Sequence, residues 1–164
     1  MKQKTPPKPL PSRLAGPAES PGFLLWKVSN AWQRRQRAAL QALELTHSQF
    51  VLLATATWFG ASETLTQARL AELAGVDAMT TSQVVRALEA AALLERREHP
   101  RDPRAKSISV TARGRALAKQ AIVVVEETDA AFFAPLGKRA TDLVQLFDVL
   151  VNSEVSPETR KTEL

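Results

Sequence analysis

The chain has 164 residues, of which 45% are hydrophobic, and a formal net charge of +5, which fits a single globular domain with a substantial core and favours polyanionic partners. It contains no cysteine, which excludes disulfides, thiolate zinc sites and thiol-based redox sensing. No apolar run approaches the roughly 20 residues of a membrane span, and the N-terminus does not resemble a secretory signal, so we expect a cytoplasmic protein.

Both ends of the chain are expected to lie outside the folded domain. Residues 1–21 are basic and contain six prolines, which interrupt any helix, so we expect a disordered arm. A solvated tail is the simplest interpretation, and an arm that follows a DNA phosphate backbone is the alternative. Residues 153–164 are expected to form a flexible tail, which leaves residues 22–152 for the domain.

The first half of the domain is predicted to contain three helices. Apolar side chains recur at helical spacing over residues 23–43, which predicts a long first helix. Thr46 caps a second helix that is apolar on most sides and ends at Gly60, as expected for an element buried in the core. Thr66 caps a short third helix, and Gly75 ends it.

A fourth helix follows the turn at Gly75. Asp77 caps it, and apolar residues recur on one of its faces to about Leu94. A helix, a glycine turn and a second helix with outward polar side chains form the pattern of a helix-turn-helix, whose second helix enters the DNA major groove. The outward face of this recognition helix also carries Met79. We assign the major-groove contacts to Thr80, Ser82, Gln83 and Arg86.

Residues 94–111 place alternating polar and apolar side chains on either side of a charged tip. This pattern predicts a β-hairpin with Ile108 and Val110 facing inward. A basic hairpin taken alone is most often an ordinary solvated hairpin. Directly after a helix-turn-helix it is expected to be a wing, because guanidinium groups suit the negative potential of the minor groove. We assign the DNA contacts of the wing to Arg101, Asp102, Arg104 and Lys106.

Two further helices are predicted over residues 113 to about 133 and 138 to about 152, separated by Pro135 and Gly137. Together with the first helix they carry more apolar surface than a small DNA-binding motif needs to bury. An exposed apolar patch of that size is rare in monomers. We therefore expect a homodimer.

With helices on both sides of a helix-turn-helix and wing, residues 23–151 resemble the multiple-antibiotic-resistance regulator (MarR) family. The most specific motifs are LTHSQFVLL, LTQARLAELAGVD, LEAAALLERR and RDPRAKSISVTARG. Within the last motif, Asp102 and Arg104 match the Asp-x-Arg pair of the family's wing. Thr111 and Gly114 match the threonine and glycine that begin the next helix.

The resemblance implies roles for individual residues. In the family the wing arginine enters the minor groove and the aspartate holds the wing's arginines in place, which assigns these roles to Arg104 and Asp102. Two positions depart from the family. Ala92 replaces a glycine after the recognition helix, and alanine adopts a left-handed conformation poorly, so a turn of different geometry is one outcome. Gln83 replaces a common arginine, which favours adenine over guanine as its base.

The expected fold is mainly α with a small β-hairpin. A winged helix-turn-helix domain, at about residues 46–111, is flanked by dimerisation helices at residues 23–43 and 113–152. The expected function is that of a homodimeric, sequence-specific DNA-binding transcriptional regulator on a palindromic operator. The resemblance further implies a repressor released by a small, often aromatic ligand.

Such a ligand would lie in a crevice between the dimerisation helices and the DNA-binding lobe. Each candidate residue for this crevice is more simply explained as a core or surface residue. The candidates are Trp26, Trp32, His47, Phe50 and Trp58.

Catalysis and protein binding are the two alternatives to DNA binding. Catalysis is disfavoured because the chain has two histidines, no tyrosine and no phosphate-binding loop, and neither a cofactor nor a metal is expected. The carboxylates of Glu126, Glu127 and Asp129 are most simply an exposed helix face. A winged helix that binds proteins is the other alternative, because fold alone does not fix function. The wing arginine beside a hydroxyl-rich helix favours nucleic acid.

Overall fold

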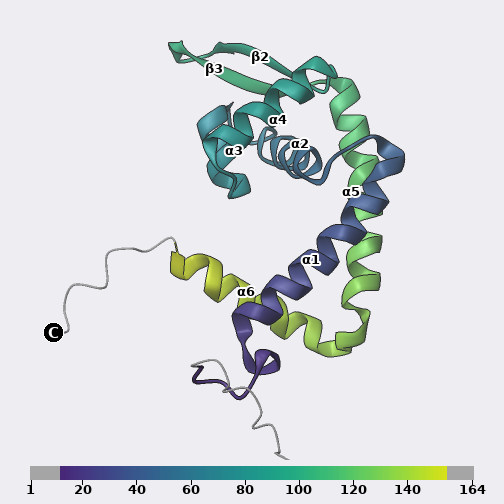
Figure 1. Cartoon of the computed structure of the whole chain (residues 1–164). Helices are drawn as coiled ribbons and strands as arrows, with labels where there is room; N and C mark the ends of the chain where they lie inside the picture. Colours follow the sequence, from purple (N-terminus) through teal and green to yellow (C-terminus); the bar gives the residue numbers. More distant parts are fainter. Residues whose placement is uncertain (1–11, 155–164) are drawn as a thin grey trace, which may run out of the picture.

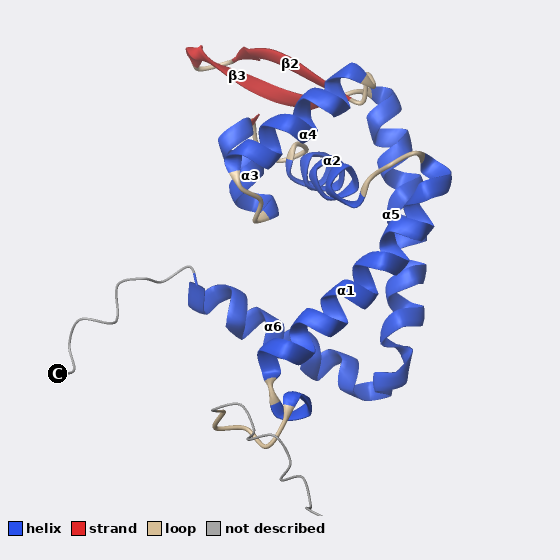
Figure 2. Cartoon of the chain, viewed as in Figure 1, coloured by secondary structure: helices blue, strands red, loops and turns tan. Residues whose placement is uncertain are grey.

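The computed structural model describes residues 12–154, with the backbone alone for residues 102–105 and 154. It is mainly helical with a small antiparallel sheet, as predicted (Figure 2). The helices are α1 (Pro21–Leu40), α2 (His47–Phe59), α3 (Gln67–Ala74), α4 (Ala78–Ala90), α5 (Ala112–Phe133) and α6 (Ala140–Glu154), with short 3-10 turns at Pro17–Glu19, Gln41–Leu43 and Ala134–Arg139. The strands are β1 (Leu65–Thr66), β2 (Leu94–His99) and β3 (Asp102–Val110).

The elements form a winged-helix lobe, which holds the predicted helix-turn-helix and wing, and a helical stem. Helices α2, α3 and α4 gather beneath the β2–β3 hairpin, while α1 and α5 run side by side away from this lobe (Figure 1). Helix α6 turns back from the far end of α5 (Figure 1). This arrangement places the predicted recognition helix and wing at one end and the predicted dimerisation helices at the other.

The wing is the larger part of a three-stranded sheet in the order β1-β3-β2, with both pairings antiparallel. Ile108 in β3 lies opposite Leu65 on one side and Arg96 on the other. Ile108 is buried, as predicted, and Leu94 at the base of β2 is buried beside it. The short strand β1 therefore fastens the base of the wing to the start of α3.

The core is built around α2. Leu52, Leu53 and Ala56 on this helix have no exposed surface. They pack in one cluster with residues of α3, α4 and α5, including Leu70, Leu88 and Ala121. The sequence predicted a helix buried on most sides at this position, and the structure confirms it, because an element apolar all round has no face for water.

Helices α2, α3 and α4 of the winged-helix lobe each begin at the residue that the sequence indicated. The side chains of Thr46, Thr66 and Asp77 each accept a hydrogen bond from the backbone N–H three residues ahead. At Thr46 the cap is reciprocal, since Gln49 Oε1 accepts from the Thr46 N–H at 2.8 Å. These caps satisfy N–H groups that the first turn of a helix leaves unpaired.

The recognition helix ends four residues earlier than the sequence predicted. It stops at Ala90 and not near Leu94 because Ala92 adopts a left-handed conformation, with φ of 55°. The N–H of Ala92 then bonds the carbonyl of Glu89, and the N–H of Leu93 bonds that of Leu88, both at 2.8 Å. This is a Schellman ending. Alanine therefore keeps the turn that glycine would favour, with the strain of a left-handed Cβ.

The ends of the chain differ in part from the prediction. Ser20 caps α1, which begins at Pro21 and so includes the last residue of the predicted arm. Residues 1–11 and 155–164, which hold most of the predicted arm and tail, lie outside the described residues. Within residues 12–154, no helix is both long enough and apolar enough to cross a lipid bilayer.

Helix α6 leaves much apolar surface uncovered. The side chains of Val144 and Val151 are 67% and 64% exposed, and others on this helix are similar. The N-terminal half of α1 adds more exposed apolar residues, among them Leu25 and Trp26. The exposed apolar residues of α6 are Val144, Leu146, Phe147, Val149, Leu150 and Val151.

Candidate nucleic-acid interface

The recognition helix α4 is anchored by its inner face and its cap. Thr81, Val85 and Leu88 have no exposed surface, as the predicted apolar stripe requires. Asp77 Oδ1 accepts a hydrogen bond from the Thr80 N–H at 2.9 Å. This bond, together with the nearby Thr80 side chain, favours the carboxylate and lowers the pKa of Asp77. The first turn of α4 is thereby fixed.

The outer face of α4 carries the predicted DNA contacts. Gln83 and Arg86 are exposed, whereas Thr80 and Ser82 are half-buried. Arg86 Nη2 donates to Ser82 Oγ at 3.1 Å, and Arg86 Nε donates to the Ser82 carbonyl at 3.2 Å. Since this holds the guanidinium against the helix, Arg86 presents its remaining donors from a restrained position.

One arginine joins the wing to both helices of the helix-turn-helix. Arg96 in β2 donates from Nη2 to Gln67 Oε1 of α3 at 3.0 Å. Its Nε lies 3.3 Å from Glu89 Oε1 of α4. The wing is therefore held at a set angle beside the recognition helix. No pattern in the sequence indicates this role, because Arg96 lies within a run of charged residues.

The charged residues of the wing differ in their surroundings. Arg101 is exposed at the tip, and its backbone N–H donates to His99 Nδ1 at 3.3 Å. Lys106 is exposed and forms an ion pair with Glu98 across the two strands. The side chains of the other two predicted contacts, Asp102 and Arg104, lie outside the described residues, although their backbone belongs to β3.

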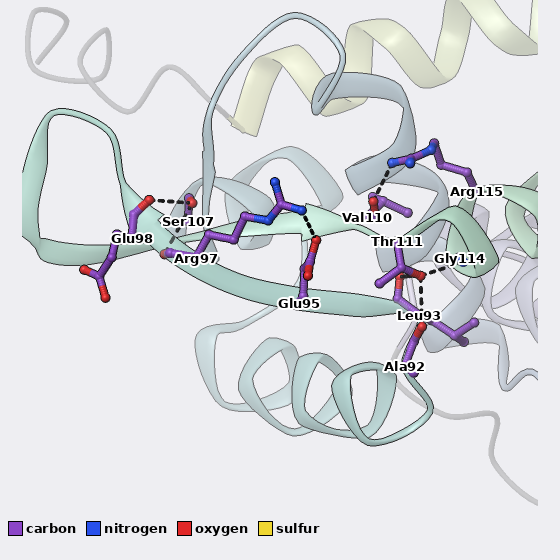
Figure 3. Close-up of polar contacts among 10 residues, drawn as sticks. All are labelled: Ala92, Leu93, Glu95, Arg97, Glu98, Ser107, Val110, Thr111, Gly114 and Arg115. Atoms are coloured by element: carbon purple, nitrogen blue, oxygen red, sulfur yellow. Dashed lines mark hydrogen bonds and ion pairs between the residues drawn. The ribbon is translucent and has the colours of Figure 1, made fainter.

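Thr111 joins the base of the wing to the turn after α4 and to the start of α5 (Figure 3). Its Oγ1 lies 2.9 Å from the Ala92 carbonyl and 3.2 Å from the Leu93 carbonyl, and it accepts from the Gly114 N–H at 2.9 Å. The Thr111 N–H also bonds the Leu93 carbonyl, at 3.1 Å. One residue thus closes the turn after α4 and caps α5.

This geometry agrees with comparisons to known proteins. The model of the MarR family matches residues 45–106, which span α2 to the wing. The HTH-type transcriptional regulator YdcH of Bacillus subtilis is 41% identical over 140 residues, which cover 85% of this chain and 95% of YdcH. The HTH-type transcriptional repressor Rv2887 of Mycobacterium tuberculosis is 37% identical over 115 residues, covering 70% of this chain and 81% of Rv2887.

Solved structures give the same result. The crystal structure of Rv2887, a MarR family protein, with salicylic acid has a TM-score of 0.63 and 33% identity, over 81% of this chain and 98% of that one. The chain belongs to the MarR family. A further structural neighbour is CouR of Rhodococcus jostii, solved with bound p-coumaroyl-CoA. It has a TM-score of 0.76 and 26% identity, and the match covers 90% of this chain and 100% of CouR.

Three of the five candidate ligand residues of this MarR family member lie together where α1, α2 and α5 meet. The rings of Trp32 and His47 are 5.0 Å apart, edge to face, and those of His47 and Phe50 are 6.5 Å apart. Burial and the positive charge of Arg37 lower the pKa of His47, against an opposing effect of Asp129. The lowered pKa favours the neutral imidazole of His47.

A buried polar group completes this cluster. Trp32 Nε1 and Gln36 Nε2 both donate to Asp129 Oδ1, each at 2.6 Å. Gln36 has no exposed surface, and its Oε1 has no hydrogen-bond partner among the described residues. Such an acceptor is costly to bury alone. We name Trp32, Gln36, His47, Phe50 and Asp129 the junction cluster.

Sequence reasoning missed Asp129, which it placed on an exposed acidic face. Glu126 and Glu127 are exposed, but Asp129 is half-buried against α1. A signal was present, since Asp129 follows the buried residues Ala121 and Val125 at a spacing of four. An acidic residue at that register is on the inner face of the helix.

The other two candidates, Trp26 and Trp58, lie apart from the junction cluster. Trp26 is 63% exposed and stacks on Phe23 near the start of α1. Trp58 is 79% exposed near the end of α2. The structure therefore does not bring the five residues into one crevice.

The chain also contains a pocket of about 630 Å³ between the wing and the end of α2. Its wall includes Thr57, Glu95 and Arg97, the last two of which form an ion pair. The junction cluster does not line it. Among the described side chains, no group of three histidine, aspartate or glutamate residues is placed to share a metal ion.

Proposed function

We propose that this MarR family member is a homodimeric, sequence-specific DNA-binding transcriptional regulator. Each subunit places the outer face of α4 in a major groove, with Ser82, Gln83 and Arg86 on base edges or phosphates. The wing lies on the flanking minor groove or backbone. Arg101 and Arg104 are its contacts there, Asp102 restrains the arginines, and Lys106 adds positive charge.

The observation that carries this proposal is the attachment of the wing to α3 and α4 through Arg96. A recognition helix and a wing must engage neighbouring grooves together. When their relative position is fixed in advance, less conformational entropy is lost on binding. The net charge of +5 supports the same partner.

The dimer is supported by the exposed apolar residues of α6 and the first half of α1. So many exposed apolar side chains on two helices are unusual for a monomer. Two-fold pairing through these helices gives two copies of α4, which demands an inverted-repeat operator. The half-sites should lie about 34 Å apart between centres, or one helical turn.

The test of DNA binding begins with selection of duplexes by the wild-type protein from a random library, because this requires no knowledge of the operator. Fluorescence anisotropy on the selected duplex should then show nanomolar binding that weakens with salt. Gln83→Ala should lose about 1–3 kcal/mol of discrimination at one base pair of each half-site. Arg101→Ala should weaken binding to every sequence and reduce the salt dependence.

A matched control for these variants is Arg34→Ala, which removes an exposed arginine from α1. It should bind like the wild type. If no duplex is enriched, the proposal is refuted, and a winged helix that binds proteins becomes the better account. An asymmetric selected site would refute the two-fold arrangement.

Regulation by a small aromatic ligand at the junction cluster is the second part of the proposal. The Rv2887 and CouR structures hold salicylic acid and p-coumaroyl-CoA, respectively. In this chain, Trp32, His47 and Phe50 supply aromatic surface, and the unpartnered Gln36 Oε1 would accept a hydrogen bond from a phenol or a protonated carboxyl group. A ligand at this junction of α1, α2 and α5 would change the spacing of the two recognition helices and release DNA, as in a repressor.

Salicylate is the first probe for this site. We expect it to quench the fluorescence of Trp32 and to weaken binding of the selected duplex. Gln36→Leu should reduce both effects, whereas Trp58→Phe, at a distant exposed position, should leave the effect on DNA binding intact. Failure of a panel of phenols and aromatic acids to change either signal would refute aromatic regulation and leave DNA binding untouched.

A further inference from the structure

Met79 is an apolar side chain on the polar face of the recognition helix. It is the second residue of α4, and its side chain is 74% exposed. The buried stripe of this helix is formed by Thr81, Val85 and Leu88, on the other side. Met79 therefore has no part in the core, and its exposure in the free protein is unfavourable.

The position of Met79 in the helix relates it to the predicted DNA contacts. Met79, Gln83 and Arg86 are spaced at i, i+4 and i+7, so they form one stripe along the exposed face. At 1.5 Å per residue this stripe is about 10 Å long, which is about three base pairs. In helix-turn-helix proteins the N-terminal residues of the recognition helix contact base edges. Met79 occupies such a position.

The neighbouring polar residue is less available for that role. The Thr80 N–H bonds the carboxylate of Asp77 at 2.9 Å, so this residue lies against the helix cap. Thr80 is also half-buried, whereas Met79 is 74% exposed. The most exposed side chain that the first turn of α4 presents to the groove is therefore the thioether of Met79.

An apolar side chain can distinguish one feature of the major groove. The C5-methyl group of thymine is the apolar group that a base pair displays there, and the other edges offer hydrogen-bond donors and acceptors. Methionine is unbranched and adapts its shape to such a surface. Burying both groups together removes apolar area from water.

From this we infer that Met79 is a specificity-determining residue that recognises a thymine methyl group beside the base pair contacted by Gln83. The inference rests on DNA binding by α4 as proposed above. It predicts a thymine at a fixed place in each half-site of the selected duplex, next to the position at which Gln83→Ala relaxes specificity.

The experiment replaces the thymines of the selected duplex with deoxyuridine one position at a time. At each position the change is made in both half-sites together. This change removes the methyl group and keeps base pairing. We expect one symmetric position at which the wild type binds the deoxyuridine duplex about tenfold more weakly. Met79→Ala should bind both duplexes equally at this position, with about the affinity of the wild type for the deoxyuridine duplex.

Two variants separate a methyl contact from a general loss of structure. Met79→Leu keeps an apolar side chain and should retain most of the preference for thymine. Gln83→Ala should also retain it, because Gln83 contacts another base pair. Circular dichroism melting of Met79→Ala should match that of the wild type, since the side chain is exposed.

The outcomes are distinguishable. Equal wild-type affinity for all deoxyuridine duplexes would overturn the inference and leave the proposed function standing. A deoxyuridine effect that persists in Met79→Ala would do the same. If the wild type selects no duplex at all, the proposed function and this inference fail together.

Discussion

A Cβ atom at Gly114 would lie 2.1 Å from the carbonyl oxygen of Leu93. The first turn of α5 therefore packs directly on the backbone that leaves the recognition helix. Thr111 reinforces the same contact, because its hydroxyl lies within hydrogen-bonding distance of the Ala92 and Leu93 carbonyls and accepts from the Gly114 N–H. This contact joins the start of α5 to the end of α4 and to the base of the wing.

Gly114→Ala should lower the free energy of unfolding by about 1–3 kcal/mol, because the added methyl group meets rigid backbone and forces α5 away from Leu93. Urea unfolding followed by circular dichroism measures this change. Gly22→Ala is the matched control. Its Cβ would meet nothing within 4 Å, so it should be neutral or slightly stabilising. Equal stability of the two variants would contradict the close contact.

Ala92→Gly should raise the free energy of unfolding by about 0.5–1 kcal/mol. Glycine removes the strain of a left-handed Cβ, and its greater freedom in the unfolded chain offsets part of the gain. Ala91→Gly serves as the control, because Ala91 has φ of −80° and no such strain. That change should be neutral or destabilising in the same urea titration. A destabilised Ala92→Gly would argue against the left-handed turn.

Asp129→Ala should lower the free energy of unfolding by about 1–3 kcal/mol per donor left unpaired, because Trp32 Nε1 and Gln36 Nε2 lose their shared acceptor. Asp129→Asn keeps one carbonyl oxygen and should cost less. The comparison is made with Glu126→Ala, an exposed change on the same helix that should stay within about 0.5 kcal/mol of the wild type. Similar losses in both alanine variants would show that Asp129 has no special role.

The stability of the protein should fall as the pH is lowered from above 6.5 to below it, in part because of His47. Its folded-state pKa lies below the ordinary value of 6.5, so the unfolded chain binds the proton more readily as the pH falls through that value. The contribution is fully present above pH 6.5 and is lost below it. His47→Gln should lose less stability across this range than the wild type does. Equal pH dependence of stability in the wild type and in His47→Gln would refute the assignment.

Val144→Glu combined with Val151→Glu should convert the dimer to a monomer, because two charges would enter an apolar contact. Size-exclusion chromatography with light scattering gives the mass directly. The double variant Gln145→Glu and Asn152→Glu changes the charge equally at exposed polar positions of α6 and should remain more dimeric. A wild-type protein that is monomeric at all concentrations would refute the dimer itself.

The helix starts, the helix-turn-helix and the wing could be predicted because their signals are local. The caps at Thr46, Thr66 and Asp77 act over three residues, and the buried stripe of α4 is a matter of periodicity within one helix. The same is true of the alternation that places Ile108 inside the wing. A sequence displays such relations directly.

The junction cluster and the fixed angle of the wing were decided by the tertiary structure. Trp32 and Asp129 are 97 residues apart in the chain. Which residue of α5 contacts which residue of α1 cannot be predicted from patterns within either helix. Arg96 likewise joins two helices that it reaches only after the chain has folded. The left-handed turn at Ala92 belongs here too, because the burial of Leu88 and Leu93 and the Thr111 bonds stabilise a conformation that alanine by itself disfavours.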